Sequence, residues 1–237
     1  MADLEGEARA RYVRRMFGRI ARRYDLLNRL MSAGQDRRWR SEVIRRIGLK
    51  PGERLLDVGC GTGDLALEAL RRQPRARVVG VDFSLPMLAL ARRRKGADGA
   101  AWVLADGLHL PFARESFDAA VSGFLLRNVS DVDLALGEQR RLLKPGGRIA
   151  CLDTTPPPPT WFKPLIEFHL QRIIPWLGRW VAGDPEAYNY LPGSTRRFLP
   201  AEALAQRMEH LGFRGVVFVR RMLGTVALHW GVREGRA

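Results

Sequence analysis

The spacing of apolar residues predicts that the chain begins with helices. Apolar side chains step by four and three through the first segment, which is typical of an amphipathic helix. The resulting stripe contains Val13, Phe17, Ile20, Tyr24, Leu27 and Met31. A Ser-Ala-Gly break follows at residues 32–34, and we expect Asp36 to N-cap a second helix that runs through Ile47 and ends near Gly48. Residues 8–48 are therefore predicted to form a helical segment that precedes the main fold.

Beyond residue 50, short apolar runs alternate with helical patterns. We expect strands at residues 54–58, 77–82, 101–105, 117–122, 148–153, 214–220 and 225–230. Helices are expected from Asp64 and over about 84–94, 131–143 and 200–211, with a turn at residues 144–147. This alternation predicts an α/β fold with a mostly parallel, seven-stranded sheet and helices on both faces. A length of 237 residues suits a single domain of this kind.

An apolar stretch separates the fifth expected strand from the last helix. Residues 161–181 carry three tryptophans and two phenylalanines among many aliphatic residues. The stretch is too long and too apolar for a simple loop, so we interpret residues 155–197 as a helical insertion or lid, kinked at Pro164 and Pro175. No apolar run approaches the ~20 residues that a membrane-spanning helix needs.

The net charge of the chain is also unusual. The formal net charge is +15, and only four of the 40 basic residues are lysines. Such a balance suits an anionic partner, either nucleic acid or a phospholipid surface, although the arginine bias alone can reflect genome composition. Two cysteines and a charged N-terminus are typical of a cytoplasmic protein with free thiols. No Cys/His cluster has metal-ligand spacing, so no metal site is expected.

Three glycines at alternate positions follow the first expected strand. The segment reads LLDVGCGTGD and places Asp57 before Gly59, Gly61 and Gly63. Glycines let the backbone turn tightly and let a ligand lie against bare main chain. The spacing differs from the G-x-G-x-x-G of dinucleotide-binding proteins. It resembles motif I of the Rossmann-like, class I methyltransferases that use S-adenosylmethionine (SAM); the alternative is an ordinary strand-to-helix turn.

Further acids stand where this cofactor would need them. Asp82 ends the second strand, and one carboxylate can accept hydrogen bonds from both hydroxyls of a ribose. Asp106 and Gly107, after the third strand, are placed to meet the adenine, and Asp57 orients the glycine loop and the methionine amino group. The alternatives are a helix N-terminal acid for Asp82 and a plain turn at Asp106.

Segments spread over the chain resemble the ubiquinone/menaquinone biosynthesis C-methyltransferase family. They read RYDLLN at 23–28, MSAG at 31–34, WR at 39–40, LRNV at 126–129, RLLKPGGR from 141, YNYLPGSTR at 188–196 and ALHWG at 227–231. The resemblance implies SAM-dependent methylation of a prenylated quinol ring, with demethylmenaquinol as the first candidate. It also implies cofactor contacts at Thr62, Asp82, Asp106, Gly107 and Gly123. Leu125 departs from a Gly of the family and adds bulk beside the expected site.

The reaction needs few residues because the methyl group on sulfur is already activated, so alignment matters most. The ring carbon becomes nucleophilic when a quinol hydroxyl loses its proton. Arg127 is a candidate to stabilise that phenolate, or to hold a water that takes the proton, and Asn128 to bind the ring oxygen. The alternatives are a structural salt bridge for Arg127 and a turn cap for Asn128.

Three more side chains are catalytic candidates. Tyr24 either lines the ring pocket and passes a proton or belongs to the core. His169 and His229 are candidate bases because imidazole titrates near neutrality, although a lone histidine is more often structural.

A polyprenyl tail favours an enzyme that works at a membrane surface. The aromatic insertion and the N-terminal arginines suit peripheral contact with the inner face of the cell membrane. Alternatively, they pack on the core, on a second subunit of a homodimer or in a quinone-biosynthesis complex. Two other functions stay open. A nucleic-acid methyltransferase would explain the charge, but residues 125–128 replace the proline-aromatic motif that holds a base. A non-catalytic subunit is opposed by the intact glycines and acids.

Overall fold

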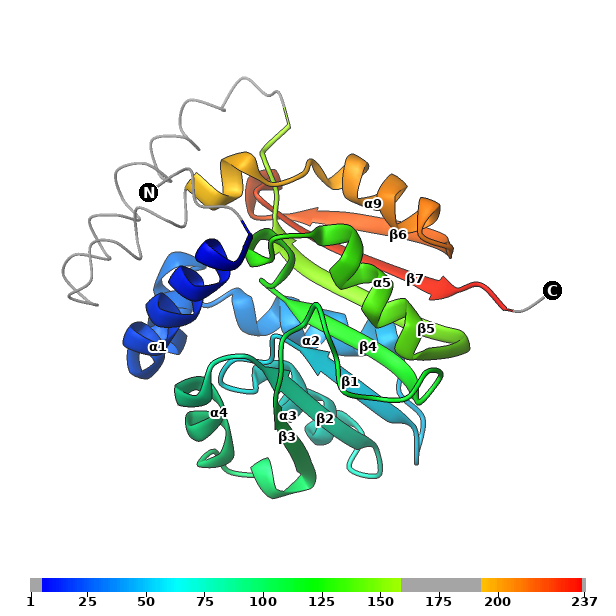
Figure 1. The fold of residues 1–237 in the computed structure, drawn as a ribbon, viewed down its shortest axis with the longest axis horizontal. Helices are drawn as coiled ribbons and strands as arrows, with labels where there is room; N and C mark the ends of the chain where they lie inside the picture. The colour runs from blue at the N-terminus through cyan, green and yellow to red at the C-terminus, as the bar shows by residue number, and fades with distance from the viewer. Residues whose placement is uncertain (1–5, 159–192, 236–237) are drawn as a thin grey trace.

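The computed structural model describes residues 6–158 and 193–235, and its centre is a seven-stranded sheet (Figure 1). The strand order is β3-β2-β1-β4-β5-β7-β6. β7 is antiparallel to both of its neighbours, and the other adjacent strands pair in parallel. The strands are β1 (Arg54–Val58), β2 (Arg77–Asp82), β3 (Ala100–Leu104), β4 (Phe117–Gly123), β5 (Leu143–Thr154), β6 (Phe213–Arg221) and β7 (Val226–Arg233). The predicted sheet is confirmed.

Helices cover both faces of this sheet, as Figure 1 shows. They are α1 (Gly6–Met31), α2 (Asp36–Ile47), α3 (Asp64–Arg72), α4 (Leu85–Arg92), α5 (Val132–Leu142) and α9 (Ala201–His210), with short 3₁₀ turns η1 (Ala97–Gly99), η2 (Leu126–Asn128) and η4 (Met222–Gly224). Alternate residues of β1 serve the two faces because strand side chains alternate. Leu55 packs with α2 and α3, whereas Leu56 and Val58 pack with α5 and α9.

The N-terminal helix α1 uses its predicted stripe to attach to the domain. Val13, Ile20 and Leu27 are buried, and Phe17 and Tyr24 pack against them. In Figure 1, α1 lies beside α4, at the edge of the sheet where the parallel strands end. The helix therefore borders the edge at which open α/β sheets bind ligands.

Two details of the sequence prediction were wrong. Asp36 was expected to cap α2, but Gln35 occupies that position and Asp36 is the first helical residue. Its carboxylate instead accepts a hydrogen bond from the Ser32 hydroxyl (3.1 Å) and pairs with Arg40 (2.5 Å). Gly48 does end α2 in the left-handed conformation, with φ of 57°.

The second error concerns the Lys-Pro-Gly-Gly segment, which was expected to be a turn before a strand. β5 already begins at Leu143, which pairs with Phe117, and the pairing then jumps to Arg148 opposite Ala119. The intervening residues form a bulge in the strand. Most of the predicted insertion (159–192) lies outside the described residues. Among the described residues, no helix is long and apolar enough to cross a membrane.

Candidate active site

A cavity lies at the carboxyl ends of the central strands, where the strand order reverses between β1 and β4. Its volume is about 770 Å³, including part of its open mouth. This position is the usual one for ligands in open α/β folds. The lining includes Phe17, Tyr24, Gly59, Gly61, Asp82, Asp106, Gly107, Gly123, Leu125 and Asn128. Most of the predicted site residues therefore meet in one place.

The three glycines after β1 differ in what they do. Gly59, Gly61 and Gly63 all have positive φ (68°, 56° and 86°), which side chains rarely adopt. Gly59 and Gly61 line the cavity. Gly63 lies instead against Trp102 of β3, whose ring atom would come within 2.5 Å of an added Cβ. The first two glycines expose backbone to the cavity, and the third permits close packing. The same Trp102 ring also covers Gly80, a contact that the sequence analysis missed.

Two buried carboxylates hold the loops around the cavity. Asp82 accepts hydrogen bonds from the backbone amides of Gly61 and Ser84, both at 2.8 Å. Asp57 accepts one from the Ala66 amide, in the first turn of α3 (3.0 Å). Burial raises the pKa of Asp82 to about 6 and that of Asp57 to about 7. Oδ1 of Asp57 is buried and has no hydrogen-bond partner among the described residues. The site thus concentrates negative charge that is incompletely compensated.

The other predicted cofactor residues divide into two groups. Asp106 and Gly107 line the cavity, and an oxygen of Asp106 accepts a hydrogen bond from the Leu108 amide (2.9 Å). Gly123 also lines it and contacts Leu65, 3.0 Å from an added Cβ. The Thr62 side chain is directed elsewhere. Its hydroxyl donates to Asp25 Oδ1 at 2.6 Å, so it holds α1 instead of lining the cavity.

Tyr24 and Asn128 form a second part of the cavity wall, where the Tyr24 ring borders Gly61. The Tyr24 ring meets Phe17 edge-on, with ring centroids 5.6 Å apart. Burial raises the pKa of Tyr24, while Arg40 and Arg127 oppose that shift, so the hydroxyl is protonated at neutral pH. Asn128 Nδ2 donates to the Phe124 carbonyl (2.8 Å). Its Oδ1 is buried and has no partner among the described residues. This wall therefore presents one free acceptor and a hydroxyl that also interacts with the Asn28 side chain.

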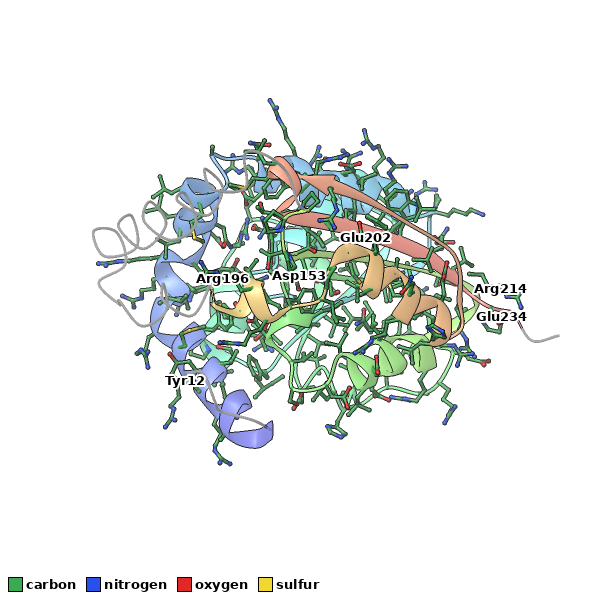
Figure 2. All side chains as sticks on the ribbon, turned by 90° about the horizontal axis from the view of Figure 1, so that it is seen from above. Tyr12, Asp153, Arg196, Glu202, Arg214 and Glu234 are labelled. Atoms are coloured by element: carbon green, nitrogen blue, oxygen red, sulfur yellow. The ribbon has the colours of Figure 1, made fainter. Side chains whose placement is uncertain are left out.

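Arg127 lies beside this wall, in a buried ion pair. Its Nη1 donates to Asp153 Oδ1 at 2.5 Å, and its backbone amide donates to Asp153 Oδ2 at 3.2 Å. Asp153 comes from the carboxyl end of β5 and is labelled in Figure 2. Both side chains are at most 4% exposed. The geometry corresponds to the structural alternative for Arg127, because the residue is not part of the cavity lining.

Sequence reasoning missed a cluster around Phe124. The ring of this cavity residue lies 5.5 Å from the guanidinium of Arg40 and 5.1 Å from that of Arg127. Phe124 also has a positive φ of 60°. Arg40 is buried, paired with Asp36 and 3.5 Å from Asp64. The two guanidiniums bring positive charge close to Tyr24, and the Trp-Arg dipeptide of the N-terminal segment was the only signal for Arg40.

Of the two histidine candidates, His229 lies apart from the cavity. His229 donates from Nε2 to the Ala201 carbonyl (2.8 Å), and its ring stacks on Phe218 (5.2 Å). Burial lowers its pKa, so the ring is neutral, and it does not line the cavity. His169 lies outside the described residues. Among the described residues, no group of His, Cys, Asp or Glu could hold a metal ion.

The strand order, the glycine loop and the acid after β2 together define a class I, SAM-dependent methyltransferase. A solved structure from Thermotoga maritima, described as a possible histamine N-methyltransferase, shares the fold with a TM-score of 0.65 at 20% identity, covering 94% of this chain and 100% of that one. The chain belongs to the ubiE/COQ5 methyltransferase family, whose profile matches residues 5–233. This confirms the resemblance seen in the sequence.

Curated relatives support the same assignment over nearly the full length. The ubiquinone/menaquinone biosynthesis C-methyltransferase UbiE of Desulfotalea psychrophila is 47% identical over 93% of this chain and 90% of its own. A demethylmenaquinone methyltransferase of Thermus thermophilus is 45% identical over 92% of this chain and 100% of its own. The protein is therefore a SAM-dependent methyltransferase of this family.

Proposed function

We propose that the protein transfers the methyl group of SAM to a ring carbon of a prenylated quinol, converting demethylmenaquinol to menaquinol. The observation that carries the proposal is one cavity that joins the glycine loop and Asp82 to Tyr24 and Asn128. The names of the Desulfotalea and Thermus relatives favour the same reaction.

The residues on one side of the cavity fit the cofactor. Gly59 and Gly61 offer bare backbone, Asp82 suits the ribose hydroxyls, and Asp106, which lines the same cavity, is assigned to the adenine. The unpartnered oxygen of Asp57 adds negative charge nearby, which suits a positively charged sulfonium. When bound, SAM supplies an electrophilic methyl group, so the protein need not activate the donor.

The other side of the cavity suits a quinol ring. Oδ1 of Asn128 can accept a hydrogen bond from one quinol hydroxyl, and the protonated Tyr24 can donate to the ring oxygen. The guanidiniums of Arg40 and Arg127 favour the phenolate that forms when a hydroxyl proton leaves to solvent. The ring carbon then forms the new carbon–carbon bond while the sulfur–methyl bond breaks. Loss of the proton on that carbon restores the aromatic ring.

We also propose that α1 contacts an anionic bilayer. Leu26 and Leu30 are one turn apart and 49% and 40% exposed, and several arginines share this helix. Figure 2 shows nitrogen-tipped side chains along much of the outline, consistent with the net charge of +15. A basic surface with exposed leucines suits anionic headgroups and adjoining acyl chains. Phosphatidylglycerol vesicles should sediment the protein, phosphatidylcholine vesicles should not, and a Leu26→Glu/Leu30→Glu variant should stay in solution.

The decisive experiment is methyl transfer with purified protein, labelled SAM and demethylmenaquinol kept reduced by dithionite. We expect label in menaquinol, and strongly reduced turnover in Asn128→Ala with little change in S-adenosylhomocysteine affinity. Methyl transfer to RNA instead of quinol would favour the nucleic-acid alternative. Failure to bind SAM in calorimetry would favour a non-catalytic subunit.

A further inference from the structure

A polar joint connects the glycine loop to the helix that carries Tyr24. Asp25 follows Tyr24 on α1, and its Oδ1 accepts the 2.6 Å hydrogen bond from the Thr62 hydroxyl. Its Oδ2 lies 3.7 Å from Nη1 of Arg94, just beyond the end of α4. The same Arg94 nitrogen donates to the Thr62 carbonyl (3.0 Å) and to Asp64 Oδ1 (2.5 Å). These four residues, Asp25, Thr62, Asp64 and Arg94, are called the Asp25 joint.

The Asp25 joint is built to persist at neutral pH. Thr62 is only 4% exposed, so its hydroxyl depends on Asp25. Arg40 and Arg94 lower the pKa of Asp64 against the effect of its burial, and Asp64 therefore stays charged opposite Arg94. Hydrogen bonds to an ionised carboxylate are roughly twice as strong as neutral ones. The Thr62–Asp25 hydrogen bond is therefore a strong link between the glycine loop and α1.

The joint lies between the two sides of the cavity. Asp82 holds the Gly61 amide, Gly61 adjoins Thr62, and Thr62 binds Asp25 next to Tyr24. The Tyr24 ring also lies 3.9 Å from an added Cβ on Gly61. A shift of the glycine loop is thus transmitted to Tyr24 through one peptide unit and one side-chain hydrogen bond. A second polar link of α1, from Arg14 Nε to the Phe83 carbonyl (2.7 Å), reaches the loop after β2.

We infer that Asp25 is a positioning residue that couples cofactor binding at the glycine loop to the placement of Tyr24 against the quinol. This rests on the proposed function for the identity of the acceptor. Ordering the loop by the cofactor fixes Thr62, and Thr62 fixes α1 through Asp25. The donor half of the site then prepares the acceptor half.

The test compares Thr62→Val, Asp25→Ala, their double variant and the conservative Asp25→Asn. Thr62→Val keeps the shape of the side chain and removes only the hydroxyl, so it addresses the joint even if Asp25→Ala folds poorly. We expect each single variant to lower kcat about tenfold, since small misplacements of reacting groups are costly. The double variant should lose no more than either single one, and Asp25→Asn should recover part of the activity, because its amide oxygen still accepts from Thr62.

Hydrogen exchange of residues 6–31 supplies a second readout that needs no acceptor. S-adenosylhomocysteine should slow exchange of α1 in the wild type and have little effect in Thr62→Val and Asp25→Ala. Arg22→Ala, a control at an exposed arginine of α1, should keep the ligand-induced protection. Unchanged protection in the joint variants, or additive losses of kcat, would overturn the inference. If wild type fails to methylate quinols yet shows joint-dependent protection, the coupling stands and the proposed acceptor is wrong.

Discussion

The two halves of the cavity are built in different ways. On the donor half, carboxylates accept hydrogen bonds from backbone amides: Asp82 from Ser84 and Gly61, Asp106 from Leu108, and Asp57 from Ala66. On the acceptor half, the supporting contact joins two charged side chains, Arg127 and Asp153, across 26 residues. Hydrogen bonds to the backbone thus shape the donor half, whereas a long-range, buried charge pair supports the acceptor half.

This contrast has an energetic consequence. A backbone-built site keeps its shape when one side chain changes, because the strands and helix termini around it persist. A buried ion pair behaves differently, since removal of one partner leaves the other charge desolvated and unpaired. Changes in the acceptor half should therefore affect stability and turnover together, and changes in the donor half should mainly affect cofactor affinity.

The largest effect is expected from Asp153→Ala. It leaves Arg127 charged within the protein, which typically costs about 3–5 kcal/mol of unfolding free energy. Turnover should also fall strongly, because the Arg127 backbone amide loses its acceptor next to Asn128. Urea denaturation and quinol methylation measure the two effects.

Two controls separate charge burial from general damage. Asp133→Ala removes a carboxylate that lies 3.4 Å from Arg207 on the surface, with side chains 52% and 42% exposed, and should cost less than about 1 kcal/mol. An Arg127→Met/Asp153→Leu variant should regain most of the stability but not the activity. Equal stability of Asp153→Ala and Asp133→Ala would contradict the contrast between the two halves.

The next largest effect is expected from Asp82→Asn. Hydrogen bonds to a charged group contribute about 1.5–3 kcal/mol, so the Kd for SAM should rise roughly ten- to hundredfold. Stability should change less than in Asp153→Ala, because the amide oxygen can still accept from a backbone amide. Asp118→Asn is the matched control, since Asp118 also holds a backbone amide, that of Arg54 (2.8 Å), but at the start of β1. Calorimetry showing equal SAM affinity in both variants would refute the ribose assignment.

Acidity should affect the donor half next. Burial raises the pKa of Asp82 to about 6 and of Asp57 to about 7, above the ordinary value of 3.8. Between pH 3.8 and these raised pKa values, the folded protein binds more protons than the unfolded chain. The stability that the two carboxyl groups contribute is therefore present at low pH and is lost as the pH rises through 6 to 7. A cationic ligand prefers the ionised carboxylates, and SAM affinity should therefore rise about tenfold from pH 5.5 to 7.5.

S-adenosylhomocysteine provides the control for this pH dependence because it lacks the sulfonium charge. Its affinity should change distinctly less than that of SAM over the same range. Calorimetry in buffers of different ionisation heat should show protons released on SAM binding below pH 7. A flat pH profile for SAM would indicate that neither carboxylate responds to the bound charge.

The same contrast explains which parts could be predicted from the sequence. The periodicity of apolar residues predicted the strands. The residues at the strand ends then predicted that Gly59, Gly61, Asp82 and Asp106 belong to the site, because these are local features. Arg40 beside Phe124 and the partner of Arg127 could not be predicted, since nothing in a local pattern says which distant carboxylate or ring a buried arginine will meet. The role of Gly63 was also hidden, because it depends on Trp102 from another strand.

The smallest effect is expected at Leu125, on the border between the two halves. Its side chain packs on Gly59 of the donor loop, 2.8 Å from an added Cβ, and it lines the cavity next to Asn128. Leu125→Ala should widen the acceptor space. A pocket change of this size is worth about 1 kcal/mol, which is roughly fivefold in the ratio of kcat/KM for a two-ring over a one-ring quinol. The S-adenosylhomocysteine Kd should stay the same.

Competition between demethylmenaquinol and a prenylated benzoquinol measures this ratio directly. Leu134→Ala is the control, because Leu134 is an exposed leucine (41%) of α5, away from the cavity. A weaker S-adenosylhomocysteine affinity with an unchanged quinol ratio would assign Leu125 to the donor half. In that case Leu125 would serve the cofactor side of the cavity, and Asn128 alone would select the quinol ring.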